Sequence, residues 1–185
     1  IKACPKNVAY KRKIFTKKMS KEYTILVPQM SPIHFQFIEP AIKACGYNTV
    51  LLPPVDKNSV EYGLKYINND ACYPTLVTLG QIISALKSGN FDLDKTAVAM
   101  SQTGGGCRAS NYVSLLRKAL VDLDMAQIPV ISFNMAGLES NPGFKITLKM
   151  IKRLIIGAIY GDVLMRILYK TRQYEVEKGS AEAII

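Results

Sequence analysis

The chain has 185 residues, of which 49% are hydrophobic and 21% are charged, and its formal net charge is +10. This length allows one domain with a full hydrophobic core, and the composition is that of a globular protein. Most of the charge lies at the N-terminus, where residues 1–22 carry +7 and leave +3 for the other 163 residues. Because the body is only mildly basic and no motif of interleaved aromatic and basic residues is present, we expect no nucleic-acid partner.

Terminal segments flank the expected domain. The N-terminus lacks the apolar stretch of a signal peptide, and the chain begins at Ile1 instead of methionine. We therefore expect a cytoplasmic protein and a segment of a longer polypeptide. Residues 1–21 should form a basic tail or linker, and residues 22–137 an α/β domain. Residues 138–175 should form a helical segment, followed by a tail at 176–185.

Short apolar runs alternate with helical patterns along the chain. The runs that have the composition of buried strands are 23–28, 48–52, 96–100 and 129–133. The helical patterns between them are 33–45, 60–68, 74–87 and 111–122. This alternation indicates right-handed βαβ crossovers and a parallel sheet that is buried on both faces. The predicted fold is a Rossmann- or flavodoxin-like three-layer α/β sandwich with strand order 2-1-3-4.

The C-terminal segment 146–169 is apolar but interrupted by charges. Its longest uncharged run, 154–161, is far shorter than the ~20 residues that a membrane span needs, so we expect no membrane partner. Basic side chains fall on one helical face, which predicts an amphipathic helix that packs on the domain or on a neighbour: Lys145, Lys149, Lys152 and Arg153. The glycines of Gly157-x-x-x-Gly161 should permit close helix packing.

Four cysteines are present, and none forms a CxxC pair. Without a secretion signal, reduced thiols or metal ligands are favoured over disulfides. Cys45 follows an apolar helix, which is typical of a small core residue. Cys4 lies in the basic tail, and its role stays open.

The segment Ser101–Tyr112 (SQTGGGCRASNY) carries the most specific chemical signal. Gly104, Gly105 and Gly106 allow positive φ angles and a close approach of the backbone to a bound group. Cys107 follows them and precedes a helix that should begin near Asn111. The free amides and the partial positive charge of a helix start favour a thiolate. The sequence therefore predicts a cysteine that is placed to react or to bind a metal.

A similar arrangement occurs at residues 69–74 (NDACYP), where Cys72 follows a turn and precedes a proline that suits a helix start. Cys107 follows the third strand and should lie at the carboxyl edge of the sheet, where ligands collect. We expect Cys72 to approach it there, near enough for the two to share one cluster.

Several kinds of site remain open for these residues. A phosphate loop fits poorly because neither GxGxxG nor GxxxxGK[ST] is present. A catalytic thiol needs a base; the only histidine, His34, should lie at the same end of the sheet as Cys107, but we expect a capping or hydrogen-bonding role for it. Zinc usually requires four ligands at local spacings, whereas an iron–sulfur cluster tolerates cysteines from separate loops. We assign no catalytic residue.

Four motifs together resemble a known family: YTILVPQM at 23–30, NDACYP at 69–74, QTGGGCR at 102–108 and PGF at 142–144. They are similar to large activase-type proteins related to the activators of 2-hydroxyacyl-CoA dehydratases and benzoyl-CoA reductases. The resemblance covers residues 20–175 and is to the module that follows the ATP-binding activase domains.

The resemblance implies a redox role. In related dehydratase and double-cubane-cluster subunits, cysteines from Rossmann-like domains bind a [4Fe-4S] or larger cluster, so Cys72 and Cys107 become candidate iron ligands. Gly104–Gly106 would let backbone amides contact the cluster sulfides. Arg108 would offset cluster charge or bind an anionic substrate, although a surface salt bridge is an equal alternative. A further ligand is expected from a downstream domain.

The implied parent protein is an anaerobic, ATP-dependent electron-transfer activase or reductase. This chain lacks the glycine-rich ATP site, so we expect it to be inactive by itself and to bind iron weakly. Its expected partners are the other domains of the same polypeptide, a CoA-thioester dehydratase or reductase, and a second copy of the chain. The rival hypothesis is a non-catalytic docking module whose cysteines have no chemical role.

Overall fold

The computed structural model describes residues 12–68, 70–102, 108–133, 139 and 141–184, with the backbone alone for residues 108 and 109. Its centre is a four-stranded parallel sheet of order β2-β1-β3-β4, which confirms the predicted fold and strand order. The strands are β1 (Thr24–Val27), β2 (Asn48–Leu51), β3 (Thr96–Ser101) and β4 (Val130–Phe133). The register aligns Thr24 with both Asn48 and Thr96, so these strands begin at one level and their carboxyl ends share one edge.

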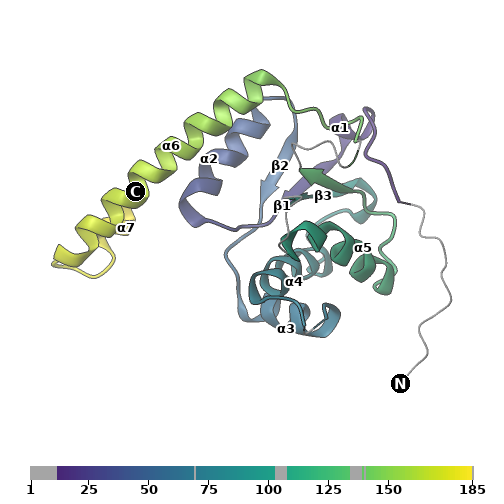
Figure 1. Cartoon of the computed structure of the whole chain (residues 1–185), viewed down its shortest axis with the longest axis horizontal. Coiled ribbons are helices and arrows are strands. Elements are labelled where there is room, and N and C mark those ends of the chain that lie inside the picture. Colours follow the sequence, from purple (N-terminus) through teal and green to yellow (C-terminus); the bar gives the residue numbers. More distant parts are fainter. Residues whose placement is uncertain (1–11, 69, 103–107, 134–138, 140, 185) are drawn as a thin grey trace.

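Helices cover both faces of the sheet. In chain order they are α1 (Met19–Glu22), α2 (Pro32–Lys43), α3 (Lys57–Tyr66), α4 (Tyr73–Lys87), α5 (Tyr112–Asp122), α6 (Leu148–Thr171) and α7 (Ser180–Ile184), with 3-10 turns η1 (Leu93–Lys95), η2 (Arg108–Asn111) and η3 (Arg172–Tyr174). Helices α3, α4 and α5 lie on one face, and α2 lies on the other with the start of α6 beside it (Figure 1). This arrangement is the expected three-layer sandwich.

The start of α3 shows how local sequence sets an element boundary. The Asp56 carboxylate accepts a hydrogen bond from the Ser59 amide at 2.8 Å and caps the helix, which begins at Lys57, three residues before the expected start. An Asp-x-x-Ser spacing of this kind is a helix-start signal in the sequence itself.

Two hydrophobic clusters fill the sandwich, one on each face of the sheet. Alternate residues of each strand point to opposite faces, so Leu26 and Val98 pack against α4 and α5, whereas Ile25 and Ala99 face α2. The first cluster is rich in leucine and isoleucine. The second is smaller and includes two alanines of β3, Ala97 and Ala99. The face under α2 therefore carries less side-chain volume at its centre.

The described part of the expected N-terminal tail lies against the domain. Phe15 is fully buried and makes an edge-to-face contact with Tyr23 at 6.2 Å between ring centroids. Arg12 forms an ion pair with Glu139 at 2.9 Å, and Glu139 also pairs with Arg117 of α5 at 2.7 Å. Residues 12–22 thus include packed structure as well as exposed lysines.

The C-terminal segment forms the expected apolar helix, α6, which begins at Leu148 because the Thr147 hydroxyl caps it by accepting from the Met150 amide at 3.2 Å. Gly157 and Gly161 allow α6 to approach α2: a Cβ atom at Gly161 would lie 2.5 Å from Cδ2 of His34. Beyond this contact α6 extends away from the sheet (Figure 1). Among the helices of the described residues, none combines the length and apolar character that crossing a membrane requires.

Candidate functional site

Cys72 lies at the N-cap position of α4, with extended backbone angles and an exposed side chain. The helix begins at Tyr73, and Pro74 occupies its first turn, as the sequence predicted. The unpaired amides of this turn give the helix start a partial positive charge, which favours a negative group beside it.

Two hydroxyl groups lie beside the Cys72 sulfur. The Thr75 Oγ1 atom is 2.9 Å from Sγ, and the Tyr112 hydroxyl oxygen is 3.6 Å from it. Hydrogen bonds from Thr75 and then from Tyr112 lower the pKa of the Cys72 thiol below its ordinary value. The thiolate is the form that binds metals and attacks electrophiles, so Cys72 is an accessible, activated sulfur.

The contact with Tyr112 joins the starts of two helices. Tyr112 is the first residue of α5, and η2 precedes it directly. Cys107 is bonded to the first residue of η2, but Cys107 and Gly104–Gly106 lie outside the described residues, and of Arg108 only the backbone is described. The predicted approach of Cys72 to Cys107 therefore stays a prediction.

Gln102 connects the two flanks of the segment 103–107. Its Nε2 atom donates to the Ser110 carbonyl oxygen at 3.1 Å, and its Oε1 atom accepts from the Ser132 hydroxyl at 2.6 Å. Gln102 follows β3, Ser110 belongs to η2, and Ser132 belongs to β4. This side chain therefore holds the residues before and after the glycine–cysteine segment to the carboxyl edge of the sheet.

A second buried amide orders the neighbouring loops. Gln81 of α4 is 3% exposed; its Oε1 atom accepts from the Gln29 amide at 2.8 Å, and its Nε2 atom donates to the Pro53 carbonyl at 2.5 Å. Gln29 and Pro53 follow β1 and β2, so α4 connects both loops to the edge that carries Cys72. Such bonds matter because an unpaired buried amide costs about 1–3 kcal/mol.

His34 belongs to the first turn of α2, and its ring lies against α6. Its Nδ1 atom is 2.9 Å from the Ser31 hydroxyl, and its Nε2 atom is 3.0 Å from the Asp162 carboxylate. This is the hydrogen-bonding role that we expected for His34, which follows the carboxyl end of β1. Because Cys107 lies outside the described residues, the expectation that it lies at the same end of the sheet as His34 stays a prediction.

Cys45 differs from Cys72 in its surroundings. It is half-buried after the end of α2, and the Arg153 guanidinium donates toward its sulfur at 3.6 Å. The same guanidinium donates to the Ala44 carbonyl at 2.6 Å. Cys45 thus belongs to the junction of α2 with α6.

Within residues 12–68, 70–102, 108–133, 139 and 141–184, no group of three or more His, Cys, Asp or Glu side chains converges on one point. Among these residues Cys72 offers one sulfur donor, and Cys107 lies outside them.

Sequence reasoning missed Thr75, Tyr112 and Gln102. Thr75 could have been found, because a residue three positions after an N-cap faces it at a helix start. Tyr112 and Gln102 act across elements, and no local spacing indicates such contacts.

A scan against protein-family models, a search of curated proteins and a search of solved structures found no match to this chain. The described geometry is that of an α/β sandwich with an exposed cysteine, whose thiol pKa is lowered by two hydroxyl groups, at the carboxyl edge of its sheet.

Proposed function

We propose that this chain is an iron–sulfur-associated redox module and that Cys72 and Cys107 contribute thiolate ligands to a cluster. The observation that carries the proposal is the pair of hydroxyl groups beside the exposed Cys72 sulfur, which lowers the pKa of its thiol. Hydrogen bonds to cluster sulfurs and ligands tune the potential of iron–sulfur centres, so Thr75 and Tyr112 would act on the potential as well as on ligation.

The sequence resemblance supports the same function. In the related dehydratase and double-cubane-cluster subunits, motifs like those of Cys72 and Cys107 bind iron, and the cluster carries low-potential electrons. The bound cluster would supply one-electron transfer, and the protein's own residues would hold and orient it. Gly104–Gly106 would offer backbone amides to the cluster, and Arg108 a positive charge. The remaining ligands would come from another domain or chain, and the parent activity would be an ATP-dependent activase or reductase in the cytoplasm.

Anaerobic reconstitution with iron and sulfide tests the proposal. It uses a longer polypeptide that includes the downstream domain, because we expect this chain to bind iron weakly by itself. We measure the iron content per chain and the absorbance at about 400 nm, where thiolate-bound clusters absorb. Both are compared between the unchanged protein and the variants Cys72→Ala and Cys107→Ala. Cys45→Ala is the matched control, because Cys45 is a free thiol at the α2–α6 junction. We expect both ligand variants to lose iron and the control to retain it. If Cys72→Ala and Cys107→Ala leave iron content and absorbance unchanged, the iron–sulfur function is wrong.

The second candidate function is a non-catalytic docking module. It is favoured by the exposed apolar side chains of α6, of which Ile155, Ile159 and Val163 are 55%, 57% and 49% exposed. Such a row is typical of a helix that packs on a partner. In a docking module, Cys72→Ala would leave the affinity for the partner unchanged. In the redox module, the same substitution would remove the cluster.

A further inference from the structure

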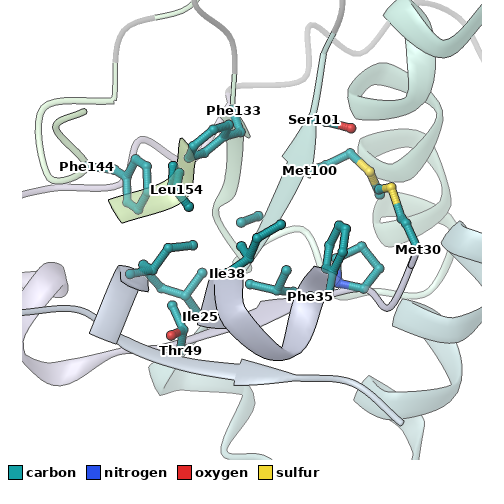
Figure 2. A pocket seen from close by; sticks show the side chains of 14 residues that line it. Ile25, Met30, Phe35, Ile38, Thr49, Met100, Ser101, Phe133, Phe144 and Leu154 are labelled. Atoms are coloured by element: carbon teal, nitrogen blue, oxygen red, sulfur yellow. The ribbon is translucent and has the colours of Figure 1, made fainter. Parts of the chain in front are cut away.

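A pocket of about 200 Å³ lies between the sheet and the helices α2 and α6. Its walls come from all four strands, from α2, from α6 and from the segment between β4 and α6 that holds Phe144 (Figure 2). Phe133, Phe144 and Leu154 gather at one end, and Met30, Met100 and Ser101 at the other. It is on the opposite face of the sheet from α4, the helix that Cys72 caps.

The sequence of β3 explains the space. The strand presents Ala97 and Ala99 to this face, where the neighbouring strands present Ile25, Val27 and Ile131. Of the two alanines Ala99 lines the pocket, and its small side chain leaves space between the sheet and the helices. Protein interiors hold few voids larger than a water molecule, so a hollow of this volume is unusual.

The lining determines which ligands fit. Fourteen described residues line the pocket; among them Thr49 and Ser101 carry the only polar side chains, and none of the fourteen is charged. The Thr49 hydroxyl already donates to the Glu39 carbonyl at 3.4 Å. A charged group would lose its hydration here without gaining a partner, whereas an apolar group would gain contacts. An apolar cavity of about 150 Å³ is large enough to bind benzene.

The pocket opens at the carboxyl edge of the sheet. Met30 is 41% exposed and Ser101 is exposed, whereas the other lining residues are buried or half-buried. A ligand would therefore enter between the loop after β1 and the end of β3. Any polar part of the ligand would remain at this mouth.

We infer that this pocket is a binding site for an uncharged aliphatic or aromatic group of about the size of a benzene ring. The group is either a small free molecule or the apolar end of a longer one whose polar part stays at the mouth. The site does not depend on iron, and its residues are distinct from Cys72, Thr75 and Tyr112. If the pocket bound no apolar probe, the proposed redox function would be unaffected. If the chain bound no iron, this inference would be unaffected.

Methyl NMR titration of the intact chain tests the inference. Toluene is the free apolar probe, 3-phenyl-1-propanol carries a polar end, and benzoate is the charged control. We expect toluene to shift the methyl signals of Ile38 and Ile42 saturably and to leave those of Ile128, in the opposite cluster, unchanged. If 3-phenyl-1-propanol also shifts these signals saturably, the ligand is the apolar end of a longer molecule. If only toluene does so, the ligand is a small free molecule. Absence of saturable shifts with both, or equal binding of benzoate, would overturn the inference.

Two filling variants locate the probe. Ala99→Leu occupies the hollow from β3, and Leu154→Phe occupies it from α6. Each should weaken toluene binding by about tenfold or more, because the filling side chain takes the volume of the probe. Leu148→Phe is the matched control on the same helix, at a residue that is 85% exposed, and should bind toluene as the unchanged protein does. If Ala99→Leu does not fold, Leu154→Phe carries the test, and unchanged affinity in the folded filling variants would overturn the inference.

Discussion

The Cys72 sulfur lies 3.6 Å from the hydroxyl oxygen of Tyr112, forty residues further along the chain. Cys72 caps α4 and Tyr112 begins α5, so this contact joins two helix starts at one edge of the sheet. Together with the Thr75 hydroxyl it gives the Cys72 thiolate two groups that can donate to it. The pKa of Cys72 therefore depends on the packing of α5.

Thr75→Val and Tyr112→Phe should each raise the pKa of the Cys72 thiol. Both substitutions remove a hydroxyl that donates to the thiolate and keep the shape of the side chain. The pH dependence of Cys72 alkylation, followed by peptide mass spectrometry, should move to higher pH, with slower reaction at pH 7. Cys45 in the same molecule is the control, and its rate should stay unchanged. An unaltered pH profile of Cys72 in both variants would contradict this account.

Glu139→Gln should destabilise the fold by about 1–3 kcal/mol, because it replaces a charged, largely buried hydrogen-bond acceptor of Arg117 with a neutral one. The Glu139 carboxylate accepts two hydrogen bonds from Arg117, each at 2.7 Å, and also pairs with Arg12. Urea unfolding measures the loss. Glu61→Gln is the control, because its 3.8 Å pair with Lys57 is exposed and should contribute about 0.5 kcal/mol or less.

The same ion pair predicts a dependence on pH. The hydrogen bonds and charge of Arg117, with the charge of Arg12, hold the pKa of the Glu139 carboxyl below its ordinary value. A lowered pKa in the folded state contributes stability that is fully present above the ordinary carboxyl range and is lost as the pH falls through the folded-state pKa. The acid-induced loss of stability should therefore be smaller in Glu139→Gln. Equal loss in both proteins would show that Glu139 does not contribute.

Gly161→Ala should destabilise the packing of α6 on α2 by about 1–3 kcal/mol, as overpacking does. The added Cβ atom would lie 2.5 Å from Cδ2 of His34. In a His34→Ala background the same change should cost much less, because the ring that it meets is gone. Thermal unfolding of the two single variants and the double variant measures this coupling. Additive losses would mean that His34 is not the group that excludes a side chain at position 161.

Gln102→Met should speed tryptic cleavage after Arg108, because it removes the hydrogen bonds to Ser110 and Ser132 that hold the flanks of residues 103–107. The rate is read from the appearance of the two fragments at low trypsin. Gln173→Met is the control, because its bond to the Tyr169 carbonyl lies at the end of α6. Cleavage after Arg108 at the unchanged rate would show that Gln102 does not hold this segment.

The sequence could predict the strands and the start of α4, because these depend on local composition. The four apolar runs became strands, and Pro74 correctly indicated a helix that begins after Cys72. The GxxxG spacing indicated a close approach at Gly161 but not its neighbour, His34, which lies more than a hundred residues away. The pairing of Cys72 with Tyr112 could not be predicted, because it depends on how α4 and α5 pack on the sheet.

The central claim is that Cys72 and Cys107 lie near enough to act on one ligand. Dibromobimane tests it most directly, because this reagent becomes fluorescent when it bridges two thiols. In a Cys4→Ala/Cys45→Ala variant only Cys72 and Cys107 remain. We predict a fluorescent product in which mass spectrometry finds the peptides of Cys72 and Cys107 joined within one chain. Single additions at each cysteine, with no bridged product, would contradict the claim.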